Sequence, residues 1–180
     1  MRKHARVLNS KIVFHGRVVD VKVERVIEPG DIETTREVVC HPGSVVVVPR
    51  LPDGRVILVR QYRHPVEESL WELVAGGIEH GESPRQSARR ELLEETGYRA
   101  RNVKPLLQFY SSPGFLTEKM YLFEAWNLTP SAGQPDADER IETGFFTINT
   151  IRKMIKTNEI HDGKTLVGIL LLFGTKLASR

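Results

Sequence analysis

The first third of the chain alternates between hydrophobic and polar residues. Arg17–Ile27 places valines at every second position from 19 to 23, with charged residues between them, which is the pattern of a half-buried strand. Thr34–Cys40 is a second candidate strand, and Pro29-Gly30-Asp31 between the two is a turn sequence. Together they predict a hairpin-like N-terminal sheet, which needs another surface to cover it because it is so small.

A second group of strands is expected to follow. Val45–Val48 is continuously apolar, so we expect a strand that is buried on both faces. Leu51-Pro52-Asp53-Gly54 is a hairpin turn that leads into a returning strand over Val56–Val59. Arg60–Arg63 is polar and aromatic and is interpreted as a solvated loop, and Trp71–Ala75 is a short strand.

The second half of the chain predicts three more strands and two helices. The expected strands are Val103–Tyr110, Lys119–Trp126 and Ile141–Thr147. Residues 131–140 are rich in Gly, Pro and Asp and predict an acidic loop. A helix is expected from Asn149 or Thr150 to about Thr157, and a final helix over Leu166–Lys176.

The strongest helix signal begins at Ser83 and ends at Gly97. Ser83 can cap the first turn, Pro84 suits the first helical position, and Gln86 can complete a capping box. Gly97 is a natural helix stop. The apolar positions that could dock this helix on a core are Ala88, Leu92 and Leu93.

The same helix carries crowded acidic residues. Glu91 and Glu95 lie four residues apart and share a face, which Glu94 borders, and like charges at this spacing cost about 0.2–0.5 kcal/mol. Glu94 and Glu95 also lie at the negative end of the helix dipole, and Arg90 offsets part of the repulsion through Glu94. An acidic surface in contact with solvent is the ordinary interpretation of such a face.

A divalent cation is the functional interpretation of the same face. Mg²⁺ takes oxygen ligands, usually one or two carboxylates together with waters and substrate phosphates. Gly76-Gly77 precedes the helix and lets the backbone pass close to it, so that the Ala75 carbonyl could supply a further oxygen ligand.

Length and composition fit one ordinary globular domain. The chain has 180 residues and a formal net charge of +3, and its basic residues are scattered, so no nucleic-acid-binding surface is indicated. The longest apolar run, near Ile169–Phe173, is too short to span a bilayer. No apolar run follows Arg2-Lys3-His4, so no signal peptide is expected. The lone Cys40 excludes an internal disulfide and favours a reducing compartment, the cytoplasm.

The order of elements is strands, one helix, more strands and two helices. This order predicts an α/β protein with a mixed sheet and helices on its faces, and it argues against a doubly wound parallel fold.

Gly76–Tyr98 reads GGIEHGESPRQSARRELLEETGY. Five residues separate Gly76 from Glu82, and seven more precede the run RELLEETGY. This stretch resembles the signature of the Nudix hydrolases, which cut a nucleoside diphosphate linked to another group. The resemblance implies an α/β/α sandwich with a mixed sheet, in which the stretch forms a loop, a helix and a loop. It also implies a single domain over residues 1–180, with an N-terminal sheet region at 1–43 and a Nudix core at 44–180.

Three further features resemble the ADP-ribose pyrophosphatases of that family. Ser112-Pro113-Gly114 follows the signature, with Pro113 sixteen residues after Gly97. Arg60–Arg63 and Leu73–Glu79 also match the pattern of these enzymes. The resemblance implies hydrolysis of the pyrophosphate bond of ADP-ribose, or of a similar nucleoside diphosphate sugar, to AMP and ribose 5-phosphate, with Mg²⁺ as cofactor and Mn²⁺ as the alternative ion.

Two alternatives stay open at this point. One is a Nudix hydrolase that acts on another nucleotide sugar or on a dinucleotide. The other is a Nudix-like module that senses ADP-ribose without cutting it. Such modules often have a degraded signature, and the complete set of glutamates here favours catalysis.

The resemblance also implies a metal site and a catalytic base. Glu94 would assist the metal ligands, and Glu82 would belong to the same constellation. The implied ligands are the Ala75 carbonyl, Glu91, Glu95 and Glu139. Ala137 stands where close relatives often carry a further glutamate, so the base is open between Glu139, Glu142 and the glutamates of the signature. The implied catalytic residues are Glu94, Glu95, Glu139 and Glu142.

Substrate contacts and assembly follow from the same resemblance. Arg36 and Arg63 would reach the nucleotide end of the substrate, because a guanidinium stacks on adenine or forks onto phosphate. Glu118 would hold ribose hydroxyls, and Pro113 and Gly114 complete the substrate-binding set. The N-terminal sheet would pack against a second subunit, so that Arg36 serves the partner's site in a homodimer.

Overall fold

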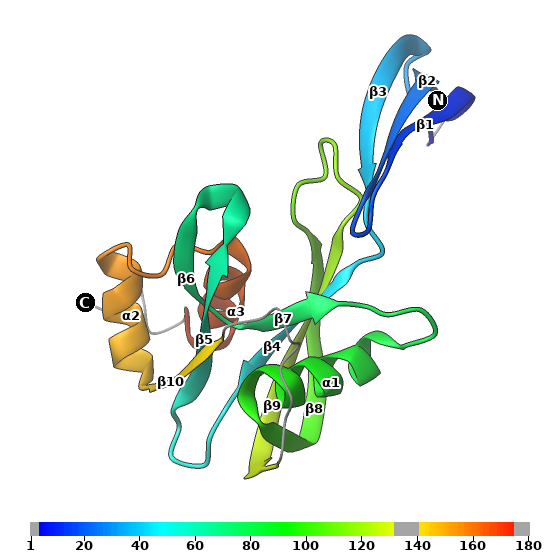
Figure 1. Cartoon of the computed structure of the whole chain (residues 1–180). Helices are drawn as coiled ribbons and strands as arrows, with labels where there is room; N and C mark the ends of the chain where they lie inside the picture. The colour runs from blue at the N-terminus through cyan, green and yellow to red at the C-terminus, as the bar shows by residue number, and fades with distance from the viewer. Residues whose placement is uncertain (1–3, 132–140, 175–180) are drawn as a thin grey trace. The chain divides into compact units, whose positions relative to one another are not determined.

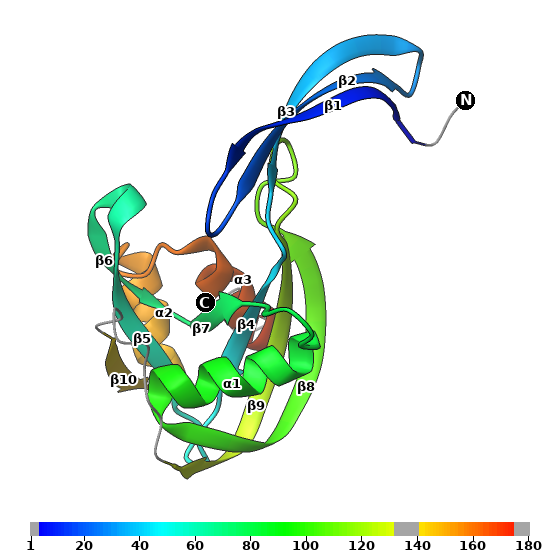
Figure 2. The same ribbon diagram turned by 45° about the vertical axis from the view of Figure 1, so that its right-hand side comes forward.

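The structure is a computed structural model that describes residues 4–131 and 141–174. The chain divides into two compact units. Unit 1 comprises Met1–Gly43 and Phe109–Met120, and unit 2 comprises Ser44–Gln108 and Tyr121–Arg180. Figures 1 and 2 show the elements of both units in two views. A single domain over residues 1–180 stays a prediction.

Unit 1 contains a three-stranded antiparallel sheet in the order β1-β2-β3. Its strands are β1 (Arg6–His15), β2 (Asp20–Glu28) and β3 (Ile32–Cys40). The predicted N-terminal hairpin is β2 and β3. Strand β1 was not predicted. Its pairing with β2 slips between Val7 and Asn9 and again between Ile12 and Phe14. Each slip breaks the two-residue period by which a strand is detected.

Unit 2 contains two sheets, with strand orders β10-β5-β6 and β7-β4-β9-β8. The strands are β4 (Ser44–Pro49), β5 (Val56–Arg63), β6 (Glu68–Glu72), β7 (Val74–Gly77), β8 (Tyr98–Tyr110), β9 (Lys119–Pro130) and β10 (Glu142–Phe146). The helices are α1 (Pro84–Thr96), α2 (Ile148–Lys156) and α3 (Gly163–Phe173), with a single 3₁₀ turn, η1 (His64–Val66), after β5.

Strand β4 forms the centre of the core. Val45 and Val47 belong to a buried cluster that includes Ala88 and Leu92 of α1. Val48, which points to the opposite face, meets α3 at Gly168, where an added Cβ would lie 3.3 Å from it. Helices α1 and α3 therefore cover the two faces of β4 (Figure 2), and the predicted burial of this strand on both faces is confirmed.

Three local expectations were wrong. Arg60–Arg63 is not a loop but the end of β5, which pairs with β6 from Val59 opposite Glu72 to Arg63 opposite Glu68. The predicted strand Trp71–Ala75 is two strands that break at Leu73 and enter different sheets. Strand β5 also pairs with β6 and β10 rather than returning along β4, to which one bridge between Arg50 and Val56 joins it.

The fold class is confirmed as α/β with a mixed sheet and a small N-terminal antiparallel sheet, and the described residues form three helices. Across residues 4–131 and 141–174, no helix is both long enough and apolar enough to cross a membrane.

Candidate active site

Helix α1 is fixed at both ends, as the sequence predicts. The Ser83 Oγ accepts a hydrogen bond from the Gln86 N–H, and the Gln86 side chain accepts one from the Ser83 N–H at 2.9 Å. Gly97 ends the helix in a left-handed conformation, with φ of 70°. The fully buried Ala88 and Leu92 dock the helix on the core. These contacts set the direction in which the acidic face of α1 points.

The guanidinium of Arg90 draws the signature carboxylates together. Its Nη1 donates to Glu91 at 2.7 Å and to Glu94 at 2.9 Å. Its Nε and Nη2 each donate to Glu82 at 3.1 Å, and Nη2 also donates to the Gly77 carbonyl at 3.0 Å. One cation therefore ties the loop before α1, the helix itself and the end of β7 into a single cluster.

This network determines the ionisation of Glu82. Hydrogen bonds from Arg90, and then one from the Ser87 hydroxyl, lower the pKa of Glu82 to about 2. Burial disfavours the charge on Arg90, but its hydrogen bonds with Glu82 and Glu91 outweigh that cost and raise its pKa. Arg90 thus cancels one of the three negative charges that it binds, and the cluster keeps a strongly negative field.

Gly76 makes room for one of the carboxylates. A Cβ atom built on residue 76 would overlap the carboxylate of Glu91. The Glu91 side chain therefore lies directly against the backbone of β7, one residue from Ala75. Glu91 and Glu95 are only 12% and 6% exposed. Arg90, which binds Glu91, is shared with Glu82 and Glu94, so a further cation would be stabilising beside these buried charges.

These donors fit a hard divalent cation. Carboxylate and backbone carbonyl oxygens are the ligands that Mg²⁺ takes, and it keeps several waters and substrate oxygens as further ligands. In the two described ranges, no three His, Cys, Asp or Glu side chains already form a cage for a metal ion. Glu139, a predicted ligand, lies outside the described residues.

The other predicted residues of unit 2 are Arg63 and Glu142. Arg63, at the end of β5, donates two hydrogen bonds to Glu72. Glu142, at the start of β10, is 65% exposed and lies 3.9 Å from Arg60.

The remaining predicted residues belong to unit 1. Arg36, on β3, donates to both carboxylate oxygens of Glu28, at 2.8 and 2.9 Å. Glu118 accepts a hydrogen bond from the Ser111 hydroxyl at 2.7 Å and lies 3.9 Å from the ring of His41. Pro113 and Gly114 lie in the intervening turn and are exposed.

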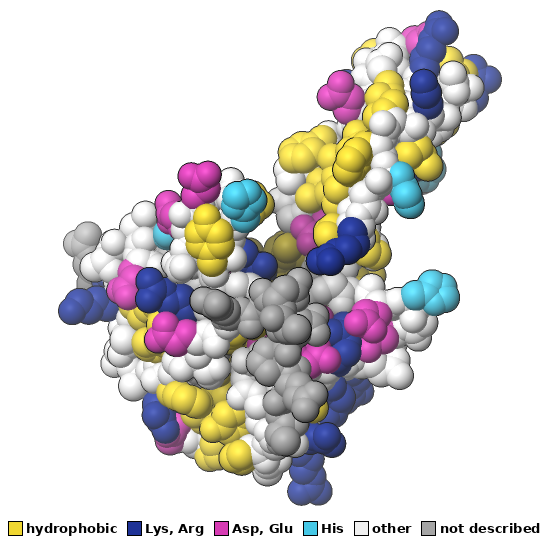
Figure 3. All heavy atoms as spheres, in the orientation of Figure 1, with side chains coloured by type: hydrophobic (Ala, Val, Ile, Leu, Met, Phe, Trp, Pro, Cys, Tyr) yellow, Lys and Arg dark blue, Asp and Glu magenta, His cyan; other side chains and the backbone are white. Residues whose placement is uncertain are grey.

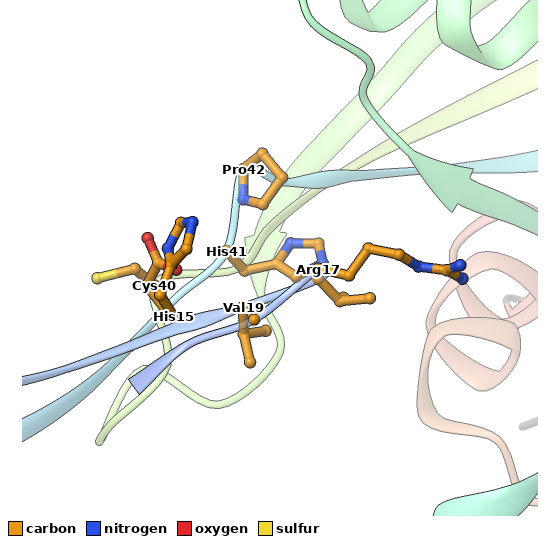
Figure 4. A pocket seen from close by; sticks show the side chains of 9 residues that line it. His15, Arg17, Val19, Cys40, His41 and Pro42 are labelled. Carbon is orange, nitrogen blue, oxygen red and sulfur yellow. The ribbon is translucent and has the colours of Figure 1, made fainter. Parts of the chain in front are cut away.

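Unit 1 also contains a hollow of about 410 Å³ that the sequence did not point to. Figure 4 shows its wall, which includes His15, Cys40 and His41. Asp20 also lines it and lies 2.5 Å from the ring of His15. None of the described residues that are assigned to the catalytic site lines this hollow.

A second charged cluster, around Glu72, was not predicted from the sequence. Its signal was present, because Glu72 is a lone acid inside the apolar run Leu70–Val74, and a buried charge of this kind requires a partner. Its partners, Arg63 and Lys164, could not be inferred, because no short-range pattern joins either of them to Glu72.

The site is formed where the acidic helix α1 lies against the glycine-containing strand β7, and several proteins similar to this chain are named as enzymes. A sequence profile of the NUDIX domain matches residues 41–166. An ADP-ribose pyrophosphatase of Bacillus subtilis (strain 168) is 38% identical over 162 residues, which cover 89% of this chain and 88% of that protein. A methanol dehydrogenase activator of Bacillus methanolicus is 37% identical over 169 residues, 93% of this chain and 91% of its own length.

The solved structures agree on the fold. The crystal structure of an ADP compounds hydrolase matches with a TM-score of 0.84 at 22% identity, over 96% of this chain and 94% of that chain. The chain belongs to the NUDIX family and is a Nudix hydrolase. Hydrolases of this family act on small-molecule nucleotide substrates and generally use a divalent metal ion.

Proposed function

We propose that this Nudix hydrolase cleaves the pyrophosphate bond of ADP-ribose, or of a similar nucleoside diphosphate sugar, to give AMP and ribose 5-phosphate. The observation that carries the proposal is the cluster in which Arg90 holds Glu82, Glu91 and Glu94 beside Gly76. The choice of substrate is supported by the relative from Bacillus subtilis that is named an ADP-ribose pyrophosphatase.

Magnesium is the proposed cofactor, with manganese as the alternative. The residues that would hold the ion are the Ala75 carbonyl, Glu91, Glu95 and Glu139. A bound divalent ion neutralises phosphate oxygens and lowers the pKa of an attacking water.

The protein's own contribution is preorganisation. Arg90 fixes three carboxylates before the substrate arrives, so they need little rearrangement during the reaction. A carboxylate then accepts the proton of the water that attacks phosphorus. The proposed candidates for this base are Glu94, Glu95, Glu139 and Glu142.

The proposed substrate contacts are those that the family resemblance implies. Arg63 would bind the diphosphate through its planar guanidinium, which can donate two parallel hydrogen bonds to phosphate oxygens. Arg36 and Glu118, with Pro113 and Gly114, would contact the nucleoside and ribose. The Ser111–Glu118 hydrogen bond fixes the carboxylate for that purpose.

We also propose that the chain forms a homodimer through its N-terminal sheet. Large apolar side chains are exposed along unit 1, and Figure 3 shows hydrophobic side chains gathered over this sheet. Every described position of β1 is exposed. A second copy would cover apolar surface that a monomer leaves in water. The residues concerned are Val7, Leu8, Ile12, Val13, Phe14, Val18 and Ile32. The cytoplasm is the proposed compartment, on the evidence of the single cysteine.

The direct test is to measure AMP release from ADP-ribose with Mg²⁺ present, and again after a chelator is added. We expect release that the chelator abolishes. Equal rates in the two conditions would contradict the metal-dependent mechanism. A panel of other nucleotide sugars and dinucleotides decides the substrate, and calorimetry that finds ADP-ribose bound but never cut would indicate a sensing module.

A further inference from the structure

Glu72 lies at the end of β6 with 1% of its side chain exposed. The Nε and Nη2 of Arg63 donate to its two carboxylate oxygens, at 2.9 and 2.7 Å. Lys164 of α3 donates to the same carboxylate and lies 3.1 Å from Asp162. Two cations and two anions thus form a compact network that is neutral overall. Such a network is tolerated inside a protein because every charge in it has a partner.

The register of the β5–β6 hairpin shows what this contact requires of Arg63. Val59 stands opposite Glu72, and Arg63 stands opposite Glu68. Directly opposed residues share a face, so the side chains of Arg63 and Glu72 lie on the same face, four residues apart along the strands. Arg63 must therefore extend back along the hairpin to reach Glu72. A flexible side chain is held in one orientation by this contact.

Glu72 is itself held firmly by α3. Asp162 caps the helix by accepting hydrogen bonds from the Thr165 N–H at 3.0 Å and from the Thr165 hydroxyl at 2.6 Å. The same hydroxyl accepts a hydrogen bond from the N–H of Leu73, the residue after Glu72, at 2.8 Å. Backbone and side chain are both fixed at this point, so Glu72 is a rigid anchor.

The guanidinium of Arg63 has two distinct edges. The Nε–Nη2 edge faces Glu72, so Nη1 lies on the opposite side. Arg63 is 36% exposed, whereas Glu72 is almost fully buried, and the open part of the guanidinium is therefore the part turned away from Glu72. Its hydrogen bonds with Glu72 raise the pKa of Arg63, and the charge of Glu95 adds to this rise. Arg63 thus lies within electrostatic reach of the acidic face of α1.

We propose that Glu72 is a positioning residue that turns the Nη1 edge of Arg63 toward the diphosphate of the substrate. It acts through Arg63 and does not touch the substrate. The inference rests on the proposed function, because that function assigns Arg63 to the diphosphate. Lys164 contacts both Glu72 and Asp162. It therefore balances the second negative charge of the network and keeps Glu72 ionised beside Arg63.

The test compares Glu72→Gln, Arg63→Lys and the double variant in ADP-ribose hydrolysis with Mg²⁺. A misplaced binding group costs about 10- to 100-fold, so we expect Glu72→Gln to raise KM by this factor with a smaller change in kcat. Arg63→Lys removes the bidentate hydrogen bonding of the guanidinium and should raise KM by a similar factor. The double variant should be no worse than Arg63→Lys by more than about twofold, because both changes remove one arrangement.

Two further variants serve as a control and as a substitute. Glu68→Gln makes the same chemical change on the same strand, at an exposed residue that pairs with His161 at 3.2 Å, and should leave KM unchanged. Glu72→Asp keeps the charge but shortens the side chain, so it serves if Glu72→Gln does not fold. A KM for folded Glu72 variants within twofold of the wild type, or a double variant whose effect is the product of the single effects, would overturn the proposal.

A readout without substrate separates this proposal from the function it rests on. In ¹⁵N–¹H spectra, the Arg63 Nε–H should give a signal that Arg63→Lys removes and that Glu72→Gln shifts or broadens. An unchanged signal in Glu72→Gln would overturn the positioning role, whatever the substrate. If the wild type fails to cut ADP-ribose while the signal behaves as expected, the proposed substrate is wrong and the anchoring of Arg63 stands.

Discussion

The carboxylate of Glu91 lies in the space that a side chain at Gly76 would fill. Helix α1 and strand β7 can approach this closely only because residue 76 has no Cβ atom. The close contact between α1 and β7 therefore depends on Gly76 and Glu91 together.

The first prediction concerns this contact. Gly76→Ala should displace Glu91 and lower kcat/KM by about 100-fold, and overpacking should cost about 1–3 kcal/mol of stability. Gly77→Ala is the matched comparison, because a Cβ atom there meets nothing within 4 Å, and it should cost far less. Steady-state kinetics and thermal melts of both variants measure the difference. Equal losses in the two variants would show that the contact is not specific.

Glu95 provides the second prediction. It is buried on α1 with 6% exposure and is a proposed metal ligand. Glu95→Gln should keep the fold but reduce kcat by roughly 100-fold or more, because the amide keeps the shape and loses the charge. Circular dichroism checks the fold, and AMP release checks turnover. Unchanged turnover would move the metal site elsewhere.

Arg90 provides the third prediction, because it neutralises part of the acidic cluster. Arg90→Met should leave Glu82, Glu91 and Glu94 repelling one another, at a cost of roughly 3 kcal/mol in unfolding free energy. Added Mg²⁺ should then raise the Tm of the variant more than that of the wild type, because the ion replaces the lost positive charge. A variant whose Tm responds to Mg²⁺ no more than the wild type does would argue against this exchange of cations.

The fourth prediction is a pH dependence of stability. The pKa of Glu82 falls from 4.5 to about 2 on folding, so its ionised form stabilises the fold at neutral pH. This stabilisation is fully present above pH 4.5 and is lost as the pH falls toward 2. Melting curves of the wild type and Glu82→Gln should therefore differ at pH 7 and converge below pH 4.5. A gap that stays constant down to pH 2.5 would contradict the assignment.

The fifth prediction tests the homodimer. Ile12→Glu places a charge within the exposed apolar residues of β1 and should convert a dimer into a monomer in analytical ultracentrifugation. Lys153→Glu reverses the charge of an exposed residue on α2, which is not part of the proposed interface, and should leave the dimer intact. A wild-type protein that sediments as a monomer at micromolar concentration would remove the basis of this assembly.

Most of the confirmed predictions depend on residues that are close together in the sequence. Ser83, Gln86 and Gly97 define α1 because capping depends on residues within one turn of each helix end. The pairing of Arg90 with Glu94 followed from helical spacing, but its contacts with Glu82 and Gly77 depend on how the preceding loop folds back.

The features that were not predicted depend on pairings that a short sequence pattern does not reveal. Strand β1 was missed because its bulges break the alternation. Glu72 stood out as a lone acid in an apolar run, but its partner Lys164 lies on α3, and no short-range pattern joins the two. The role of Glu139 rests on the resemblance alone and stays a prediction.

The most direct measurement is a crystal structure with Mg²⁺ and an ADP-ribose analogue whose bridging oxygen is replaced by a methylene group. The account predicts a magnesium ion about 2.0–2.1 Å from carboxylate oxygens of Glu91 and Glu95, in contact with the diphosphate. An ion bound elsewhere, with both carboxylates turned into bulk water, would contradict it.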